Sequence, residues 1–285
     1  MNHLLCFGFG FSARALAARL DRREWKVSAT SRDAEGIAVI EAQGFHGLLF
    51  DSTLQIGPDV THLLISAPPG EHGDPVLRLF QAQLQQLSKS LKWVGYLSTT
   101  GVYGDRGGDW VDEDSPLEPT TARGQRRLEA ERNWLKLHKD FGLPVHLFRL
   151  AGIYGPGRNQ LLTVRDGSAR RIIKPGQIFS RIHVEDIAGV LAASIAKPNP
   201  GRAYNVCDDE PCPPQEVVAY AAGLLGLPLP PEIPFEDAEL SPMAKSFYAE
   251  SKRVSNRRIK AELNHRLIYP NYREGLRALL DTLTA

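Results

Sequence analysis

The sequence has only three cysteines among its 285 residues, and their scattered positions do not make a disulfide framework. Cys6 lies in an apolar run that predicts a buried strand. Cys207 and Cys212 have no nearby cysteine or histidine cluster that would complete a tetrahedral zinc site. We therefore predict neither a disulfide nor a metal centre.

Long hydrophobic runs are also missing. No apolar stretch approaches the ~20 residues of a membrane-spanning helix, and the start, MNHLLCFGFGF, lacks the basic residues and cleavage site of a signal peptide. The net charge of +1 gives no general attraction to nucleic acid or to a membrane surface. These absences favour a cytoplasmic protein with a small-molecule substrate and no nucleic-acid or membrane partner. A homodimer is left open.

Short β-rich runs alternate with helical patterns in the first half of the chain. Strands are expected at 3–7, 25–31, 46–50, 61–67, 92–98 and 145–150. Apolar residues recur with helical spacing at 13–20, at 76–91 and from 120 onward. Mostly apolar strands alternating with helices predict an α/β fold, a Rossmann-type doubly wound parallel sheet covered on both faces.

The first strand runs directly into GFGFSA at 8–13 and then into a helix. Gly8 allows the tight turn, Gly10 lets a pyrophosphate approach the backbone, and the small Ala13 lets the helix pack against the strand. Amide groups at the helix start would point at the phosphates. The motif therefore predicts a dinucleotide-binding loop. Its predicted members are Gly8, Phe9, Gly10, Phe11, Ser12 and Ala13.

The end of the second strand bears on the choice of dinucleotide. Ser31 and Arg32 fit the 2′-phosphate of NADP, whereas Asp33 comes one or two positions late for the ribose contact of NAD. NADP is therefore preferred, and NAD remains open.

Two further strand ends belong to the predicted cofactor site. Asp51 follows the third strand and would either contact the adenine ring or cap the next turn. Ala67 and Pro68 follow the fourth strand, on the carboxyl edge where such sheets bind ligands.

The pattern loosens after the sixth strand. We expect residues 1–158 to form the NAD(P)-binding domain and 178–206, which reads as strand, helix and strand, to return to it. Residues 159–177 and 207–285 carry proline-rich and turn-rich stretches and are expected to form a small C-terminal substrate lobe.

Four motifs occur in a familiar order, namely LSTTGVYGD (97–105), RLAGIYGPGRN (149–159), HVEDIAG (183–189) and YNVCDDEP (204–211). With the glycine loop, they resemble the extended short-chain dehydrogenase/reductase superfamily, in its NAD-dependent epimerase/dehydratase branch. The resemblance covers most of the chain. It implies that Thr99 hydrogen-bonds the reacting oxygen of the substrate.

The same resemblance implies that the usual catalytic pair of the family is absent. The family carries a Tyr-x-x-x-Lys pair on the next helix, and its two positions fall on Arg123 and Arg127. No tyrosine occurs from 104 to 153 and no lysine from 93 to 135, so a shifted alignment cannot restore the pair. Arginine stays protonated and cannot perform the proton exchange of the tyrosine. The two arginines are expected either to lie on the surface or clamp the cofactor, with Arg127 in the cofactor site, or to bind an anionic substrate directly.

Other groups could carry the proton. Tyr103 and Glu113 are candidate acids or bases, and His183 is expected to be structural. The spacing of the family pair recurs at Tyr248 and Lys252, but we reject this match because it lies in the C-terminal lobe.

A dinucleotide fold without the usual pair is typical of the atypical, bacterial YeeZ-like group of this superfamily, which the C-terminal residues 251–279 also resemble. The resemblance predicts an NAD(P)-binding oxidoreductase or epimerase/dehydratase-like enzyme with a small or nucleotide-linked substrate. The alternative is a non-catalytic NADP(H)-binding sensor or scaffold protein.

Overall fold

One parallel sheet forms the centre of the protein, which a computed structural model describes for residues 1–284. Seven strands run in the order β11-β7-β5-β4-β1-β2-β3, and every neighbouring pair is parallel. They are β1 (Asn2–Phe7), β2 (Trp25–Ser31), β3 (His46–Leu49), β4 (His62–Ile65), β5 (Trp93–Thr99), β7 (Val145–Leu150) and β11 (Ala203–Val206). The predicted Rossmann-type sheet is confirmed.

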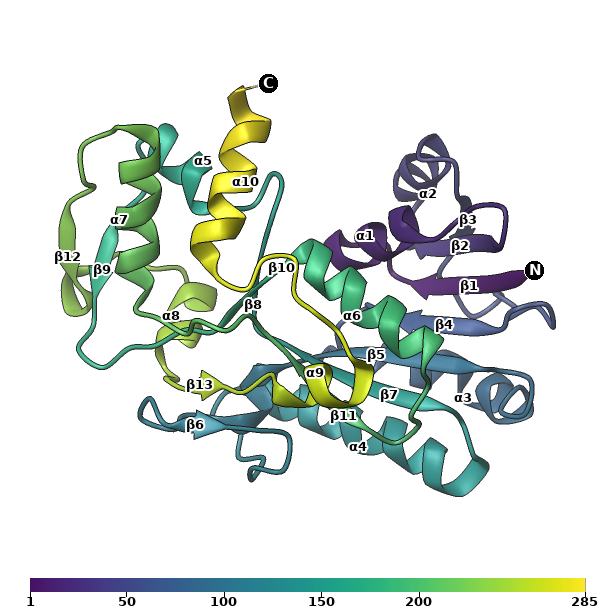
Figure 1. Ribbon diagram of the computed structural model, residues 1–285. Helices are drawn as coiled ribbons and strands as arrows, with labels where there is room; N and C mark the ends of the chain where they lie inside the picture. Colours follow the sequence, from purple (N-terminus) through teal and green to yellow (C-terminus); the bar gives the residue numbers. More distant parts are fainter. Residues whose placement is uncertain (285) are drawn as a thin grey trace.

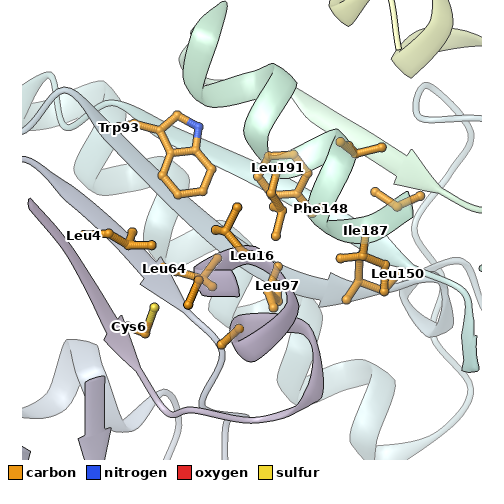
Figure 2. Packing of buried hydrophobic residues seen from close by; sticks show 14 of the residues in the cluster. Leu4, Cys6, Leu16, Leu64, Trp93, Leu97, Phe148, Leu150, Ile187 and Leu191 are labelled. Carbon is orange, nitrogen blue, oxygen red and sulfur yellow. The ribbon is translucent and has the colours of Figure 1, made fainter. Parts of the chain in front are cut away.

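Helices cover both faces of the sheet because its strands are apolar on both sides. On one face, Leu16 of α1 and Ile187 and Leu191 of α6 pack onto the central strands (Figures 1 and 2). On the other face, Phe80 of α3 and Trp134 of α4 belong to a second core cluster. The covering helices are α1 (Phe11–Arg19), α2 (Ala34–Ala42), α3 (Pro75–Gln86), α4 (Ala122–Phe141) and α6 (Val184–Ala196).

The strand order reverses beside β1. The chain runs outward from β1 to β2 and β3 and then returns to β4, on the other side of β1. Loops that follow β1 and β4 therefore diverge, and such a switch point leaves a crevice at the carboxyl edge of the sheet.

A smaller lobe lies at this carboxyl edge (Figure 1). Its helices pack around a third core cluster that contains Leu161, Val217 and Leu276. Two short parallel pairs, β8 with β10 and β9 with β12, complete it. The elements are β8 (Gly152–Tyr154), α5 (Gln160–Arg165), β9 (Arg171–Ile173), β10 (Arg181–His183), α7 (Pro214–Leu225), β12 (Glu232–Pro234) and α10 (Tyr272–Thr284).

Two C-terminal elements pack on the sheet domain instead. Strand β13 (Arg253–Val254) pairs with β6 (Trp110–Val111). Helix α9 (Arg257–Leu263) contributes Ile259 and Leu263 to the core cluster on the α1 face. Between them and the lobe lie the 3-10 turn η2 (Phe235–Asp237) and α8 (Pro242–Tyr248).

The segment predicted to return to the sheet does so in part. Strand β11 joins the main sheet beside β7, and α6 covers it. Strand β10 pairs with β8 in the lobe instead, because the chain leaves the main sheet after β7.

A buried ion pair joins α4 to the sheet. Nη2 of Arg149 lies 2.9 Å from Oε2 of Glu131, and both side chains are almost fully buried. Ser98 Oγ donates to Glu131 Oε1 at 2.5 Å. Arg149 Nη1 donates to the hydroxyl of Tyr103 at 2.9 Å, and that hydroxyl donates to Asn205 Oδ1 at 2.7 Å. The network therefore ties α4, β5, β7, β11 and the turn η1 (Thr100–Tyr103) together.

We expect Arg149→Met to lower the free energy of unfolding by about 3–5 kcal/mol, because it leaves the Glu131 carboxylate buried without its cation. Urea unfolding measures the change. The control is Lys136→Met, which removes an exposed ion pair to Asp140 and should cost less than about 1 kcal/mol. Equal losses in the two variants would show that the buried pair does not carry this energy.

Candidate active site

A cleft of about 910 Å³ lies between the carboxyl edge of the sheet and the smaller lobe. Its floor includes the start of α1 and the end of β5, and one wall is the first turn of α4. Segments 150–163, 178–181 and 244–254 contribute the facing side chains. The cleft is therefore where the topology predicts a ligand.

The glycine loop has the shape that a dinucleotide pyrophosphate needs. Gly8 adopts φ +87°, which disfavours any side chain, and its N–H donates to Thr30 Oγ1 at 3.0 Å. A Cβ atom placed on Gly10 would meet only Ser66 Oγ, at 3.8 Å, so the space in front of Gly10 is open. No side chain caps the start of α1, which leaves its first amide groups facing the cleft for phosphate oxygens.

The remaining loop residues divide between cleft and core. Phe11 and Ser12 line the cleft with Gly10. Phe9 packs edge-on against Phe45, and Ala13 lies on the buried face of α1. Ser66, which directly follows β4, also lines the cleft but was not predicted as a site residue. It could have been found because β4 pairs with β1, the strand that leads into the glycine loop.

Arg32 and Asp33, the two candidate side chains for the ribose of the dinucleotide, differ in their contacts at the end of β2. Asp33 is the N-cap of α2, where its Oδ1 accepts a hydrogen bond from Gly36 N at 2.8 Å. Ser31 Oγ lies 3.5 Å from the same oxygen. Arg32 is exposed, and no ion pair is formed by it within residues 1–284. The carboxylate is thus committed to the helix, whereas the guanidinium is available.

The other two strand ends are placed differently. Asp51 Oδ1 accepts from Thr53 N at 2.8 Å and from Thr53 Oγ1 at 2.6 Å, which lowers the pKa of Asp51. The carboxylate therefore caps its own turn, the second of the two expected roles. Ala67 N bonds to Phe7 O at 2.9 Å, and a Cβ on Gly8 would lie 3.3 Å from that nitrogen, so Ala67 supports the glycine loop from below. Pro68 is exposed beside it.

Thr99 stands at the carboxyl end of β5 and lines the cleft. Its Oγ1 accepts a hydrogen bond from Gly101 N at 3.2 Å and so caps η1. Because a hydroxyl that accepts can also donate, this bond leaves the Thr99 proton free for a substrate oxygen.

Tyr103 and Glu113 lie outside the cleft lining. The hydroxyl of Tyr103 is held in the buried network by Arg149 and Asn205, and burial raises the pKa of Tyr103 above its ordinary value. Glu113 Oε1 accepts from Asn205 N at 2.8 Å, and burial raises its pKa. Both side chains support the strand ends, and neither contacts the cleft.

Arg123 and Arg127 of α4 do line the cleft. Gly124 lets the helix start approach η1 closely, since a Cβ there would lie 2.7 Å from Gly101 O. Arg127 donates through Nη1 to Leu97 O, and its buried Nε has no hydrogen-bond partner within the described chain. Arg123 lies over the ring of Phe247, 4.5 Å from its centroid. Both guanidinium groups thus face the cleft without an ion-pair partner in the described chain.

Tyr248 and Lys252, the spacing match that we rejected because it lies in the C-terminal lobe, fall in the same cleft. The expected separation of this pair from the site was therefore wrong. Tyr248, Glu250 and Lys252 all line the cavity opposite α4. Lys252 Nζ donates to Glu250 Oε2 at 2.7 Å, and Thr120 Oγ1 donates to Glu250 Oε1 at 2.9 Å. Distance along the chain misled the prediction, because β13 folds back onto β6.

The cleft is strongly cationic although the chain is nearly neutral. Among the described residues, Glu250 supplies its only carboxylate. Its cationic side chains are Arg123, Arg127, Arg158, Arg181 and Lys252. Such an excess favours an anionic ligand.

His183 has a structural role in the described part of the chain. Its Nδ1 accepts from Glu185 N at 3.3 Å and caps α6, while its ring packs against Tyr154 and Tyr269. Burial lowers the pKa of His183 to about 4.

Within residues 1–284, no cluster of three metal-ligating side chains occurs. The helices of this part of the chain are also too short or too polar to span a membrane.

Known proteins share this architecture. Residues 75–207 match the NAD dependent epimerase/dehydratase family. A functionally unknown conserved protein from Silicibacter pomeroyi DSS is 54% identical, and the two structures match over 100% of both chains with a TM-score of 0.94. Residues 75–207 therefore form an NAD-dependent epimerase/dehydratase-family domain.

More distant relatives resemble the chain over most of its length. Protein YeeZ of Escherichia coli (strain K12) is 28% identical over 257 residues, which are 81% of this chain and 86% of that one. The dTDP-glucose 4,6-dehydratase of Bacillus anthracis, solved with NAD, has the same fold at 18% identity, with a TM-score of 0.77 over 100% of this chain and 96% of that one. The resemblance inferred from LSTTGVYGD and its companion motifs is confirmed.

We expect Gly10→Ala to weaken dinucleotide binding at least ~10-fold, equivalent to about 1.4 kcal/mol, because the new methyl group enters the open space in front of α1. The melting temperature should stay unchanged. Gly223→Ala is a matched control, since a Cβ at Gly223 meets nothing within 4 Å and this residue lies in α7, outside the cleft. Titration of NADPH fluorescence compares the two, and equal affinities would contradict this placement of the pyrophosphate.

Proposed function

We propose that the protein is an NADP(H)-binding oxidoreductase or epimerase-like enzyme that acts on a small anionic substrate. The observation that carries the proposal is the single cleft in which a glycine loop suited to a pyrophosphate meets Thr99 and an excess of cations. When bound, the dinucleotide would give or take a hydride. The residues described below would hold it and the substrate.

The preference for NADP is supported by the end of β2. Asp33, which would select the ribose hydroxyl of NAD, is used as the N-cap of α2. Arg32 is exposed and could pair with a 2′-phosphate. Arg127 lines the cleft and would clamp the ribose and phosphate region with its guanidinium group.

The anionic character of the substrate is supported by Arg123 and Arg181. Arg123 stands on the first turn of α4, where burial and then Arg127 lower its pKa from the ordinary value. Arg181 lies across the cleft on β10 and donates through Nη1 to Phe179 O at 3.0 Å. Forked donors of this kind suit a carboxylate or phosphate group. A nucleotide-linked substrate also meets this requirement.

A test of the reaction class is NADPH oxidation with paired carbonyl compounds that differ by one carboxylate or phosphate. We expect turnover only with the anionic member of each pair, and a raised KM in Arg123→Ala. Tight NADPH binding with no turnover across the panel would instead favour the non-catalytic sensor or scaffold.

Arg32→Gln should weaken NADPH binding by ~10–100-fold, because a charge-assisted hydrogen bond contributes about 1.5–3 kcal/mol, and should leave NADH affinity unchanged. Arg132→Gln is the control, since Arg132 is equally exposed but lies on the middle of α4. Isothermal titration with both nucleotides measures the change. An equal loss for NADH and NADPH would count against recognition of the 2′-phosphate by Arg32.

Arg127→Ala should weaken both dinucleotides to a similar degree, because Arg127 would hold a part that they share. Arg127→Lys keeps the charge at the family's lysine position and should retain most of the affinity. Fluorescence titration of NADH and NADPH follows both variants. Unchanged affinity in Arg127→Ala would exclude the clamp.

A further inference from the structure

A buried ion pair from the C-terminal part of the chain faces the cleft. Glu250 and Lys252 are 9% and 8% exposed, and their charged atoms are 2.7 Å apart. Burying a charge is costly unless the group is paired, so a lysine and a glutamate placed here need a reason beyond stability.

The segment that carries the pair is held from both sides. Ser251 N donates to Asp105 Oδ1 at 2.7 Å, and Gly108 N donates to Ser251 O at 3.0 Å. Ser251 Oγ donates to Gly176 O at 2.8 Å, and Gln177 Nε2 donates to Glu250 O at 2.7 Å. Since these bonds fix the backbone of residues 250 and 251, the flanking side chains have little freedom to leave the cleft.

The pair stands beside the end of β5. A Cβ placed on Gly101 would lie 3.6 Å from Thr99 Oγ1 and 3.9 Å from Glu250 Oε2, so the hydroxyl and the carboxylate lie close together. Arg123 occupies the position of the family's tyrosine. The charge of Glu250 interacts with the Arg123 guanidinium and raises its pKa, against the larger lowering effect of burial. Glu250 and Lys252 therefore share the cleft with Thr99 and with Arg123.

We propose that Lys252 is the proton donor and acceptor of this cleft, with Glu250 as its positioning residue, in place of the tyrosine that α4 lacks. This inference rests on the proposed function. In a reduction, the carbonyl carbon of the substrate accepts a hydride from the reduced dinucleotide, which is thereby oxidised. The carbonyl π bond breaks, and the oxygen takes a proton from Nζ of Lys252 to become a hydroxyl. The neutral amine then regains a proton from water.

The surroundings of Lys252 suit this exchange. Burial lowers the pKa of Lys252, while Glu250 and Asp105 oppose this effect and Arg106 adds to it. The net direction is downward, so the ammonium group loses its proton at a lower pH than an exposed lysine does. Tyr248 has a pKa raised by burial and is thus a poorer donor at neutral pH.

Reductive labelling tests the proposal without a known substrate. Pyridoxal 5′-phosphate forms an imine with a neutral lysine amine and releases water, and borohydride then reduces that imine to a stable secondary amine. Peptide mass spectrometry gives the labelled fraction of each lysine between pH 6 and pH 10. The internal control is the exposed Lys89. We expect the midpoint of Lys252 to lie at least about one pH unit below that of Lys89.

Two variants sharpen the result. Glu250→Gln removes the carboxylate that favours the ammonium form, so the midpoint of Lys252 should fall further. Thr120→Val keeps both charges and should move it less. A midpoint equal to that of Lys89, no labelling at any pH, or no shift in Glu250→Gln would each overturn the proposal.

NADPH titration of the same preparations separates this inference from the proposed function. If Lys252 is reactive but NADPH does not bind, the proposed dinucleotide site is wrong and the proton exchange by Lys252 is supported. If NADPH binds but Lys252 is unreactive, the dinucleotide site is supported and the proton exchange by Lys252 is wrong. If a carbonyl substrate emerges from the panel, Lys252→Arg should lower kcat by at least ~100-fold with little change in NADPH affinity.

Discussion

The buried carboxylate of Glu131 on α4 fixes the geometry on which the cleft depends. It accepts hydrogen bonds from Ser98, one residue before Thr99, and from Arg149 on the next strand. Because Glu131 and Arg127 lie one turn apart on the same helix, holding Glu131 to the strand ends also holds the first turn of α4 over them. Arg149 extends the link to Tyr103 and Asn205. The position of the arginine pair thus follows from an interaction buried beneath it.

Two anchors of this helix do not involve positions 123 and 127. The contact of α4 with η1 relies on Gly124, and its link to the sheet relies on Glu131. This frame presents Arg123 and Arg127 to the cleft, where both side chains are permanent cations. The titratable side chains of the cleft lie on the opposite wall, which carries Tyr248, Glu250 and Lys252.

Local pattern was enough to predict the sheet, and parallel strands bring their carboxyl ends to one edge, so Gly10 and Arg127 line the same cleft. It could not separate cap from ligand at Asp51 or Asp33, since both roles use a short carboxylate just after a strand. Tyr103 was a candidate acid or base within LSTTGVYG, yet its side chain is buried and its hydroxyl bonds to Arg149 and Asn205 outside the cleft. Lys252 was beyond prediction, because its place depends on β13 pairing with β6 across more than a hundred residues.

The charge distribution connects the two walls of the cleft. In the described chain, Lys252 is paired with Glu250, but Arg123 rests on an aromatic ring and Arg127 on a backbone carbonyl, neither of which neutralises it. Unpaired cations in a shared cavity repel one another, so the empty cleft carries an electrostatic cost that an anion would relieve. A dinucleotide pyrophosphate bound at the glycine loop would relieve part of this cost. In the proposed function, a negative group of the substrate would relieve the remainder beside Arg123 and Arg181.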